Sequence, residues 1–234
     1  MGPQIQLESM SLTLGRVEIL KPVTALFQPG QLHAIVGPNG AGKTSLMRCV
    51  LGLMPHKGEI RCVWPGKATP VAYVPQQTAF EPALPVTVEE FMLTTLTRLP
   101  VQLLRRTRAR MRVIELLRRV GLEHKGHLQL GSLSGGERQR LMFAQALERD
   151  SLFWCLDEPM TGLDTDAQAL INQEISLLRR QGATLLVIHH DTDWVRRYAD
   201  QVWLIDGGLK RAGSADAVLQ QNLTPLRDEM EAYA

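Results

Sequence analysis

Short apolar runs separated by glycine and proline dominate the first part of the chain, and they predict strands. Breaks at Gly15 and Pro22 divide the N-terminal runs, which together predict a small antiparallel sheet. These runs are Ile5–Leu7, Val17–Leu20 and Val23–Phe27. The next run, Leu32–Val36, predicts a buried strand that leads through a glycine-rich turn into a helix over Lys43–Met54, ending before Pro55.

Helical periodicity replaces the strand runs between about residues 80 and 150, after two further strand candidates at Glu59–Val63 and Val71–Val74. Beyond this region strands alternate with helices, which is typical of βα units in a parallel sheet covered on both faces. The expected elements are strands Leu152–Leu156, Thr184–Ile188 and Val202–Asp206, and helices Asp166–Gln181 and Val195–Tyr198. We expect a single α/β domain over residues 1–234, in which 1–79 and 151–234 form the core and about 80–150 form an inserted helical lobe.

An arginine-rich segment within this lobe has the pattern of an amphipathic helix. Its apolar residues recur at i, i+3, i+4 and i+7, namely Val113, Leu116, Leu117 and Val120. Its basic residues are Arg105, Arg106, Arg108, Arg110, Arg112, Arg118 and Arg119. We interpret the arginines as a solvated face, with contact to anionic lipid or to a membrane partner as the alternative.

The composition is that of a globular protein with a sizeable core, with 44% hydrophobic and 21% charged residues and a formal net charge of +2. A DNA-binding domain would show a stronger basic excess, so nucleic acid is not an expected partner. The three cysteines form no CxxC pair, and Cys49 and Cys155 lie in apolar runs that predict burial. No apolar stretch reaches the ~18–20 residues that span a bilayer. The N-terminus also lacks a signal-peptide pattern, so a membrane role would depend on another subunit.

A glycine-rich loop with the pattern G-x-x-x-x-G-K-[ST] is the first chemical signal. It follows the Leu32–Val36 strand and opens a predicted helix, which is the context that this phosphate-binding motif requires. Glycines let backbone N–H groups turn toward phosphate oxygens at the positive end of the helix. We expect Lys43 to reach the β and γ phosphates of a triphosphate, and the Thr44 hydroxyl to bind Mg²⁺. The expected phosphate-binding residues are Gly37, Pro38, Asn39, Gly40, Ala41, Gly42, Lys43, Thr44 and Ser45.

Two acidic residues, Asp157 and Glu158, follow the apolar run Leu152–Leu156. In a parallel α/β sheet the end of such a strand carries groups toward the ligand. We expect Asp157 to hold hydrated Mg²⁺ and Glu158 to act as the base for an attacking water. The two acids alone are a weak signal, and their position downstream of a phosphate loop strengthens it.

A second candidate anion site is the sequence Leu133-Ser134-Gly135-Gly136-Glu137. Ser134 is a favourable N-cap, and Gly135 and Gly136 expose backbone N–H groups at the start of a helix expected to continue through Leu147. One chain rarely needs two phosphate sites for a single triphosphate.

These motifs resemble those of ABC ATPases, whose LSGGQ-type signature is present here with Glu137 as the fifth residue. The resemblance spans about Ile5 to Leu219 and implies a P-loop NTPase core of the ABC ATPase type. It also implies that two chains pack head-to-tail, so that Ser134, Gly135 and Gly136 of one chain complete the ATP site of the other. The cofactors implied are ATP and Mg²⁺.

Further residues match the family in order along the chain. Gln76 fits the glutamine that contacts Mg²⁺ and water, with Gln77 as the alternative assignment. Asp164 fits the loop that crosses the dimer seam. His190 precedes Asp191 and fits the histidine that contacts the γ-phosphate, and His189 is interpreted as its neighbour. A metal site formed by His189, His190 and Asp191 is discounted, because adjacent side chains on one strand point to opposite faces.

One residue departs from the family pattern. Many ABC ATPases carry an aromatic residue that stacks on adenine, and the corresponding position here is Leu14. The segment Met10–Ile19 contains no Phe, Tyr or Trp. We expect aliphatic packing on the base in place of stacking, with consequences for base selectivity.

The resemblance also implies partners and a location. These are a transmembrane permease, a second ATPase subunit, a periplasmic or extracellular substrate-binding protein acting indirectly, and the cytoplasmic face of the membrane. The short interval from Lys43 to Gln76, the segment Pro85–Val88 and the sequence His189-His190-Asp191 are similar to importers of zinc, manganese or iron. This similarity implies import of a metal ion or a metal chelate, with siderophore-linked iron among the possibilities. Residues Phe80–Leu96 are expected to carry the signal to the permease.

Other functions stay open at this level. A lipid or drug exporter is the main alternative. A soluble ABC ATPase acting on DNA or ribosomes is disfavoured, because the chain has one ATPase unit, no sustained heptads and no cysteine quartet. A regulator without turnover is disfavoured by the presence of both Glu158 and His190.

Overall fold

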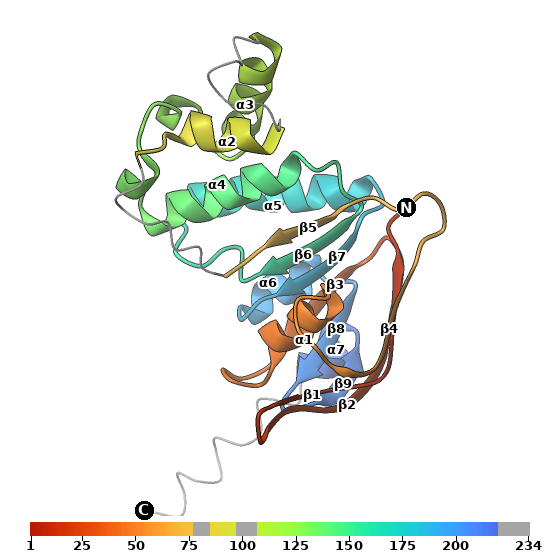
Figure 1. The fold of residues 1–234 in the computed structure, drawn as a ribbon. Helices are drawn as coiled ribbons and strands as arrows, with labels where there is room; N and C mark the ends of the chain where they lie inside the picture. The colour runs from red at the N-terminus through yellow and green to blue at the C-terminus, as the bar shows by residue number, and fades with distance from the viewer. Residues whose placement is uncertain (77–84, 97–106, 220–234) are drawn as a thin grey trace, which may run out of the picture. The chain divides into compact units, whose positions relative to one another are not determined.

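The chain folds into two compact units, one formed by Met1–Gly2 and Gly66–Ala183 and the other by Pro3–Pro65 and Thr184–Ala234 (Figure 1). The structure is a computed structural model that describes residues 1–76, 85–96 and 107–219. Four positions considered above lie outside the described residues: Gln77, Phe80, Arg105 and Arg106. The subdivision of the chain into core and lobe stays a prediction.

A mostly parallel sheet is the centre of the second unit. Its strands run in the order β7 (Thr184–Ile188), β3 (Leu32–Val36), β8 (Gln201–Ile205) and β9 (Leu209–Gly213). β3 pairs in parallel with β7 and β8, and β9 pairs antiparallel with β8. Every residue of β3 and β7 is buried, as expected of parallel strands covered on both faces. The predicted bounds of these two strands are confirmed, whereas β9 was not predicted.

The N-terminal antiparallel sheet is also confirmed, and its strands are longer than predicted. β1 (Gln4–Leu14) lies between β2 (Val17–Phe27) and β4 (Lys57–Val63). The prediction that Pro22 breaks the second strand is wrong. β2 is an edge strand, and Pro22 falls at an irregularity in its pairing with β1, where no ladder N–H is required.

Helix α1 (Lys43–Val50) ends earlier than the sequence suggested. Gly52 adopts a left-handed conformation with φ 68° and donates its N–H to Cys49 O at 2.9 Å. The Leu53 N–H donates to Arg48 O at 2.8 Å, which completes a Schellman motif. Gly52, and not Pro55, therefore terminates this helix.

The described residues of the first unit contain a parallel pair of strands, β5 (Val71–Val74) and β6 (Phe153–Asp157), and four α-helices. These helices are α2 (Val88–Leu96), α3 (Thr107–Arg119), α4 (Gly135–Leu147) and α5 (Thr165–Arg180). Figure 1 shows α2 and α3 beside α4, and the three helices contact one another. The second unit also has two short helices, α6 (Thr192–Tyr198) and α7 (Ala215–Leu219).

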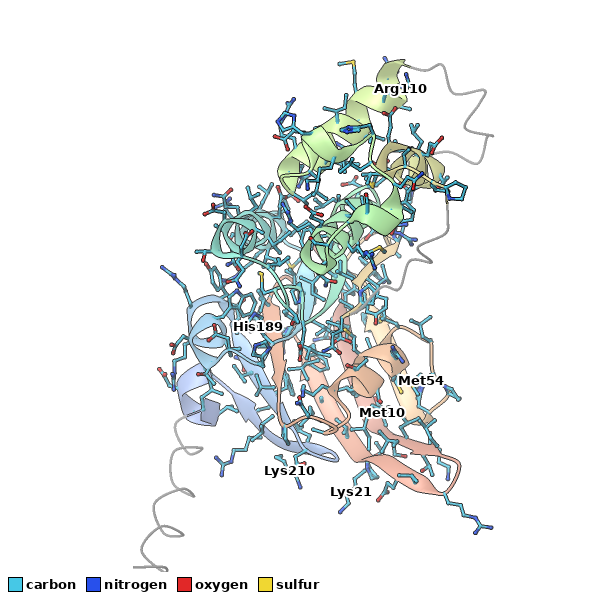
Figure 2. All side chains as sticks on the ribbon, turned by 90° about the vertical axis from the view of Figure 1, so that its left-hand side faces the viewer. Met10, Lys21, Met54, Arg110, His189 and Lys210 are labelled. Atoms are coloured by element: carbon cyan, nitrogen blue, oxygen red, sulfur yellow. The ribbon has the colours of Figure 1, made fainter. Side chains whose placement is uncertain are left out.

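Helix α3 has the predicted apolar stripe. Val113, Leu116, Leu117 and Val120 are all buried. The interpretation of its arginines as one solvated face is only partly right. Arg110, labelled in Figure 2, is exposed but pairs with Glu89 at 2.8 Å, and Arg119 is mostly buried and paired with Glu174. The Glu174 partner of Arg119, which the local pattern does not reveal, holds that side chain partly buried.

None of the helices in the described ranges is both long and apolar enough to cross a membrane. Cys49 and Cys155 are buried, as predicted, and Cys62 is exposed.

The approach of β4 to β1 generates a stability prediction. Gly58 has φ 77°, and a Cβ there would overlap the backbone carbonyl of Ser9. We expect Gly58→Ala to lower the free energy of unfolding by at least about 2 kcal/mol, through a left-handed alanine and a backbone clash. Denaturant titration at constant m-value measures this change. Gly66→Ala is the control, since a Cβ at Gly66 meets nothing within 4 Å, and its effect should stay within about 0.5 kcal/mol. Equal midpoints for Gly58→Ala and the wild type would contradict the β1–β4 register.

Candidate functional site

The predicted phosphate loop connects β3 to α1 and depends on its glycines. Gly37, Gly40 and Gly42 have φ values of 146°, 78° and 93°. A Cβ at Gly37 would overlap the carbonyl oxygen of Ile205, and one at Gly42 would lie 2.6 Å from Leu20 Cδ2. Packing as well as backbone conformation therefore requires glycine at both ends of the loop.

The Lys43 side chain folds back over this loop. Its Nζ donates to the carbonyl oxygens of Gly37 and Pro38, both at 2.8 Å. The loop is further fixed by the Gly207 N–H, which donates to Ala41 O at 3.1 Å. The sequence motif thus forms a closed turn with an ammonium group on it.

The N-terminus of α1 differs from those of the other helices that carry predicted site residues. Its N-cap is Gly42, no side chain caps it, and its first turn has no acidic residue. Helices α4, α5 and α6 are capped instead by the side chains of Ser134, Asp164 and Asp191. Neither an N-cap side chain nor a carboxylate of its first turn therefore neutralises the positive end of the α1 dipole, which favours an anion there.

The two histidines that follow β7 have different environments. His189, labelled in Figure 2, is buried, and its ring lies parallel to that of Trp194 with centroids 4.2 Å apart. Its Nδ1 accepts the Asp191 N–H at 3.1 Å. His190 is exposed, and its ring stacks on His189 with centroids 5.6 Å apart. His189 is therefore a packing residue, and His190 keeps a surface open to a ligand.

Asp191 caps α6 by accepting the backbone N–H groups of Trp194 and Asp193. These hydrogen bonds, with that from Trp194 as the largest cause, lower the pKa of Asp191. The Asp191 carboxylate thus serves as the N-cap of α6, the helix that begins directly after the histidine pair and Asp191.

The predicted metal and base residues lie at the end of β6. Asp157 is the last residue of this strand and is 1% exposed. Glu158 has a φ of 50°, a left-handed conformation that is unfavourable for a non-glycine residue. Its Oε2 accepts hydrogen bonds from Gln76 Nε2 and Thr161 Oγ1, each at 3.1 Å. The structure therefore brings Gln76 and Glu158 together, and it adds Thr161, which sequence reasoning missed.

Ser134 caps α4 through a reciprocal capping box. The Ser134 N–H donates to Glu137 Oε2 at 2.9 Å, and the Glu137 N–H donates to Ser134 Oγ at 3.3 Å. The other carboxylate oxygen of Glu137 accepts a hydrogen bond from Lys125 Nζ. This bond is the largest cause of the lowered pKa of Glu137. The spacing of Ser134 and Glu137 is a recognisable capping-box signal, whereas Lys125 has no local signal.

The signature helix also contacts two other predicted site segments. A Cβ at Gly136 would lie 2.6 Å from Gly162 O, directly before the loop that carries Asp164. The buried Gln139 donates its Nε2 to Pro75 O at 3.1 Å, next to Gln76. Asp164 itself accepts the Ala167 N–H at 2.8 Å and caps α5. These segments therefore form one connected cluster within the first unit.

Leu14 ends β1 and pairs with Val17 across the turn at Gly15. Both side chains are exposed, at 43% and 62%. The following strand reaches the phosphate loop, since Leu20 contacts the position of a Gly42 Cβ. The aliphatic pair Leu14 and Val17 is thus exposed on the hairpin that contains the position of the family's aromatic residue.

A family model described as "ABC transporter" matches residues 20–161. The chain belongs to the ABC transporter family. It is one of the ATP-binding subunits of this family and is therefore an ATPase. The identification made from the sequence motifs is confirmed.

Several curated relatives are metal transport subunits. The chain is 34% identical to the manganese transport system ATP-binding protein MntB of Halalkalibacterium halodurans, over 89% of this chain and 85% of the relative. It is 38% identical to the zinc import ATP-binding protein ZnuC of Pseudomonas fluorescens, over 92% and 78%. It is 34% identical to the zinc transport system ATP-binding protein TroB of Treponema pallidum, over 86% and 78%.

Solved structures share the fold. The ATP-binding subunit of an ABC transporter superposes with a TM-score of 0.78 at 24% identity, over 98% of this chain and 97% of that chain. The ADP conformation of another ATP-binding cassette gives 0.75 at 20% identity, over the full length of both. The predicted α/β fold of the ABC ATPase type is therefore confirmed.

Two adjacent glycines of the signature provide a matched prediction. We expect Gly136→Ala to lower the free energy of unfolding by at least about 1 kcal/mol, because its Cβ would press on Gly162 O. Gly135→Ala should leave it unchanged or raise it by up to about 1 kcal/mol, because a Cβ at Gly135 meets nothing within 4 Å and alanine favours helix. Thermal and denaturant unfolding measure both. If the two variants proved equally stable, the contact between α4 and the Gly162 turn would be refuted.

Proposed function

We propose that this chain hydrolyses ATP with Mg²⁺ to power the import of zinc or manganese ions through a separate transmembrane permease. The observation that carries the proposal is the set of relatives named for manganese or zinc transport, which match 86% or more of the chain at 34–38% identity. The short interval between the phosphate loop and Gln76 agrees with this group.

The phosphate chain of ATP binds the loop from Gly37 to Ser45. Glycine conformations, the uncapped α1 terminus and the Lys43 ammonium support this assignment, since each favours an anion. The nucleotide oxygens replace the loop carbonyls as partners of Lys43. Asn39 and Pro38 are exposed in the loop and face the nucleotide.

Hydroxyl, carboxylate and amide oxygens are the donors available for a divalent cation. Thr44, Asp157 and Gln76 would hold Mg²⁺, and such oxygen donors suit a hard cation. When bound, Mg²⁺ would neutralise negative charge on the phosphate chain. Asp157 would supply its carboxylate from the buried end of β6, directly before Glu158.

Glu158 acts as the base in the hydrolytic step. Water attacks the γ-phosphorus, the bond to the β–γ bridging oxygen breaks, and Glu158 accepts the proton of the water. Gln76 and Thr161 orient the carboxylate through their hydrogen bonds to Oε2, and the strained backbone at Glu158 fits a functional position. His190 contacts the γ-phosphate from its exposed position.

A second ATPase subunit completes each site. Ser134, Gly135 and Gly136 of one chain bind the γ-phosphate held by the other, and Asp164 lies at the seam. The exposure of Ser134, Gly135 and Asp164 supports this role. The permease binds the pair at the cytoplasmic face of the membrane, and a periplasmic or extracellular substrate-binding protein delivers the metal to the permease.

The adenine base packs against Leu14 and Val17. Both are exposed and adjacent across the hairpin, and the strand that follows reaches Gly42. Aliphatic packing is less specific for a base than ring stacking, so discrimination between ATP and other nucleoside triphosphates is weak.

Replacement of the base tests the catalytic assignment. We expect Glu158→Gln to lower the ATPase rate at least about 100-fold, because general-base catalysis is lost. The variant should elute with ATP as a stable dimer in size-exclusion chromatography. Glu18→Gln, at an exposed glutamate of β2, is the control and should keep full activity. A Glu158→Gln variant that is monomeric with ATP and fully active would show that another group is the base.

The cargo is tested with the complex isolated by mild solubilisation of membranes. Mass spectrometry should identify a permease bound to this chain. In proteoliposomes with that permease and its binding protein, zinc or manganese should stimulate ATP hydrolysis and accumulate, and Glu158→Gln should abolish both. Stimulation by lipids or drugs without metal uptake would overturn the import proposal and leave the ATPase assignment intact.

A further inference from the structure

The N-terminus of α4 carries a carboxylate in the turn that is proposed to bind phosphate. Glu137 Oε2 lies 2.9 Å from the Ser134 backbone nitrogen, and the Ser134 hydroxyl lies 3.3 Å from the Glu137 backbone nitrogen. The carboxylate therefore lies in the same turn as the backbone N–H groups that are proposed to bind phosphate, and its negative charge repels a triphosphate there. Tight binding of ATP at this turn therefore needs a cation that compensates the charge of Glu137.

Lys125 is placed to provide this compensation. It lies in the short 3₁₀ helix Glu123–Lys125, and its Nζ donates to Glu137 Oε1. The backbone of this turn is fixed, because the Lys125 N–H donates to Leu122 O and the Leu128 N–H donates to Lys125 O. The Glu137 side chain is only 16% exposed and the Lys125 side chain 39%, so solvent screens this pair less than a fully exposed one.

We propose that Lys125 is a positioning residue for nucleotide binding, which neutralises Glu137 so that the Ser134 turn accepts the γ-phosphate of ATP. The inference rests on the proposed function, in which the signature of one subunit meets the nucleotide of the other. The capping box and the charge balance are separate contributions. Glu137 holds the helix terminus through Oε2, and Lys125 removes the electrostatic penalty through Oε1.

The neighbouring cation does not take over this role. Arg138 follows Glu137 directly, but its Nε donates to Leu133 O at 3.0 Å and its Nη2 donates to Gly131 O at 3.1 Å. Its guanidinium is held on the loop that precedes the signature. Lys125 is therefore the cation that the described residues place on the Glu137 carboxylate.

A charge-compensation role makes a prediction that a purely structural ion pair does not. Glutamine at position 137 has an amide oxygen that can still accept the Ser134 N–H, and it carries no charge. Loss of Lys125 should therefore be harmful when residue 137 is glutamate and harmless when it is glutamine.

The test is the ATP dependence of hydrolysis by the full chain, measured for Lys125→Met, Glu137→Gln and the double variant. We expect Lys125→Met to raise KM for ATP about fivefold with kcat within about twofold, the effect of one uncompensated like charge. Glu137→Gln and the double variant should stay within about twofold of the wild type in both constants. Lys125→Arg should restore the wild-type KM.

Matched controls separate this result from misfolding and from failure of the proposed function. Lys67→Met removes an exposed lysine of the same unit and should change nothing. Lys125→Gln is the second neutral variant if Lys125→Met melts at a lower temperature. A double variant as impaired as Lys125→Met, or a Lys125→Met variant with unchanged KM, would overturn the proposal. Ser134→Arg tests the proposed function itself, because its normal KM and kcat would mean that the signature binds no nucleotide.

Discussion

Backbone N–H groups at the starts of α1 and α4 are the constraint on which the candidate site depends. A helix start leaves several N–H donors without intrahelical partners, and they must be satisfied by a side chain, by water or by an anion. At α1 the chain supplies no capping side chain. The loop before this helix contains glycines with positive φ values, which residues other than glycine rarely adopt. At α4 the chain supplies Ser134 and Glu137. The first terminus is built for an external anion, and the second is stable without one.

This difference has consequences for when each half of the site can act. A loop without its own cap gains most from the nucleotide, so the conformation of Gly37–Gly42 and the binding of phosphate support each other. A helix with a reciprocal cap is already ordered, so it would lose little entropy on meeting the nucleotide of another subunit in the proposed dimer. An ordered signature and a receptive loop together favour association that depends on ATP.

The sequence predicted what local patterns determine. The phosphate loop, strands β3 and β7, the Ser134 cap and the buried stripe of α3 each follow from spacing within one element, and the structure has them where expected. The incorrect or missing predictions concern features that a local sequence pattern does not determine. The end of α1 depends on Gly52 adopting a left-handed conformation, and the continuity of β2 through Pro22 depends on its place at a sheet edge. Gln139 and Lys125 act through partners that tertiary folding brings near, so no local pattern reveals them. Thr161 lies only three residues after its partner Glu158, and its hydrogen bond forms in the turn where Glu158 has a left-handed backbone.

The fifth residue of the signature shows how one side chain can satisfy two opposing demands. A carboxylate is favourable at a helix N-terminus, since it accepts N–H groups and interacts well with the dipole. The same carboxylate is unfavourable beside a bound triphosphate, because like charges repel. Glutamine would avoid the repulsion, but it is a weaker acceptor than a carboxylate because it carries no charge. With Lys125 on the far oxygen, Glu137 keeps the charge-assisted cap while its net charge is cancelled. Under the proposed role of Lys125, the local stability of α4 and the binding of an anion at its N-terminus are thereby compatible.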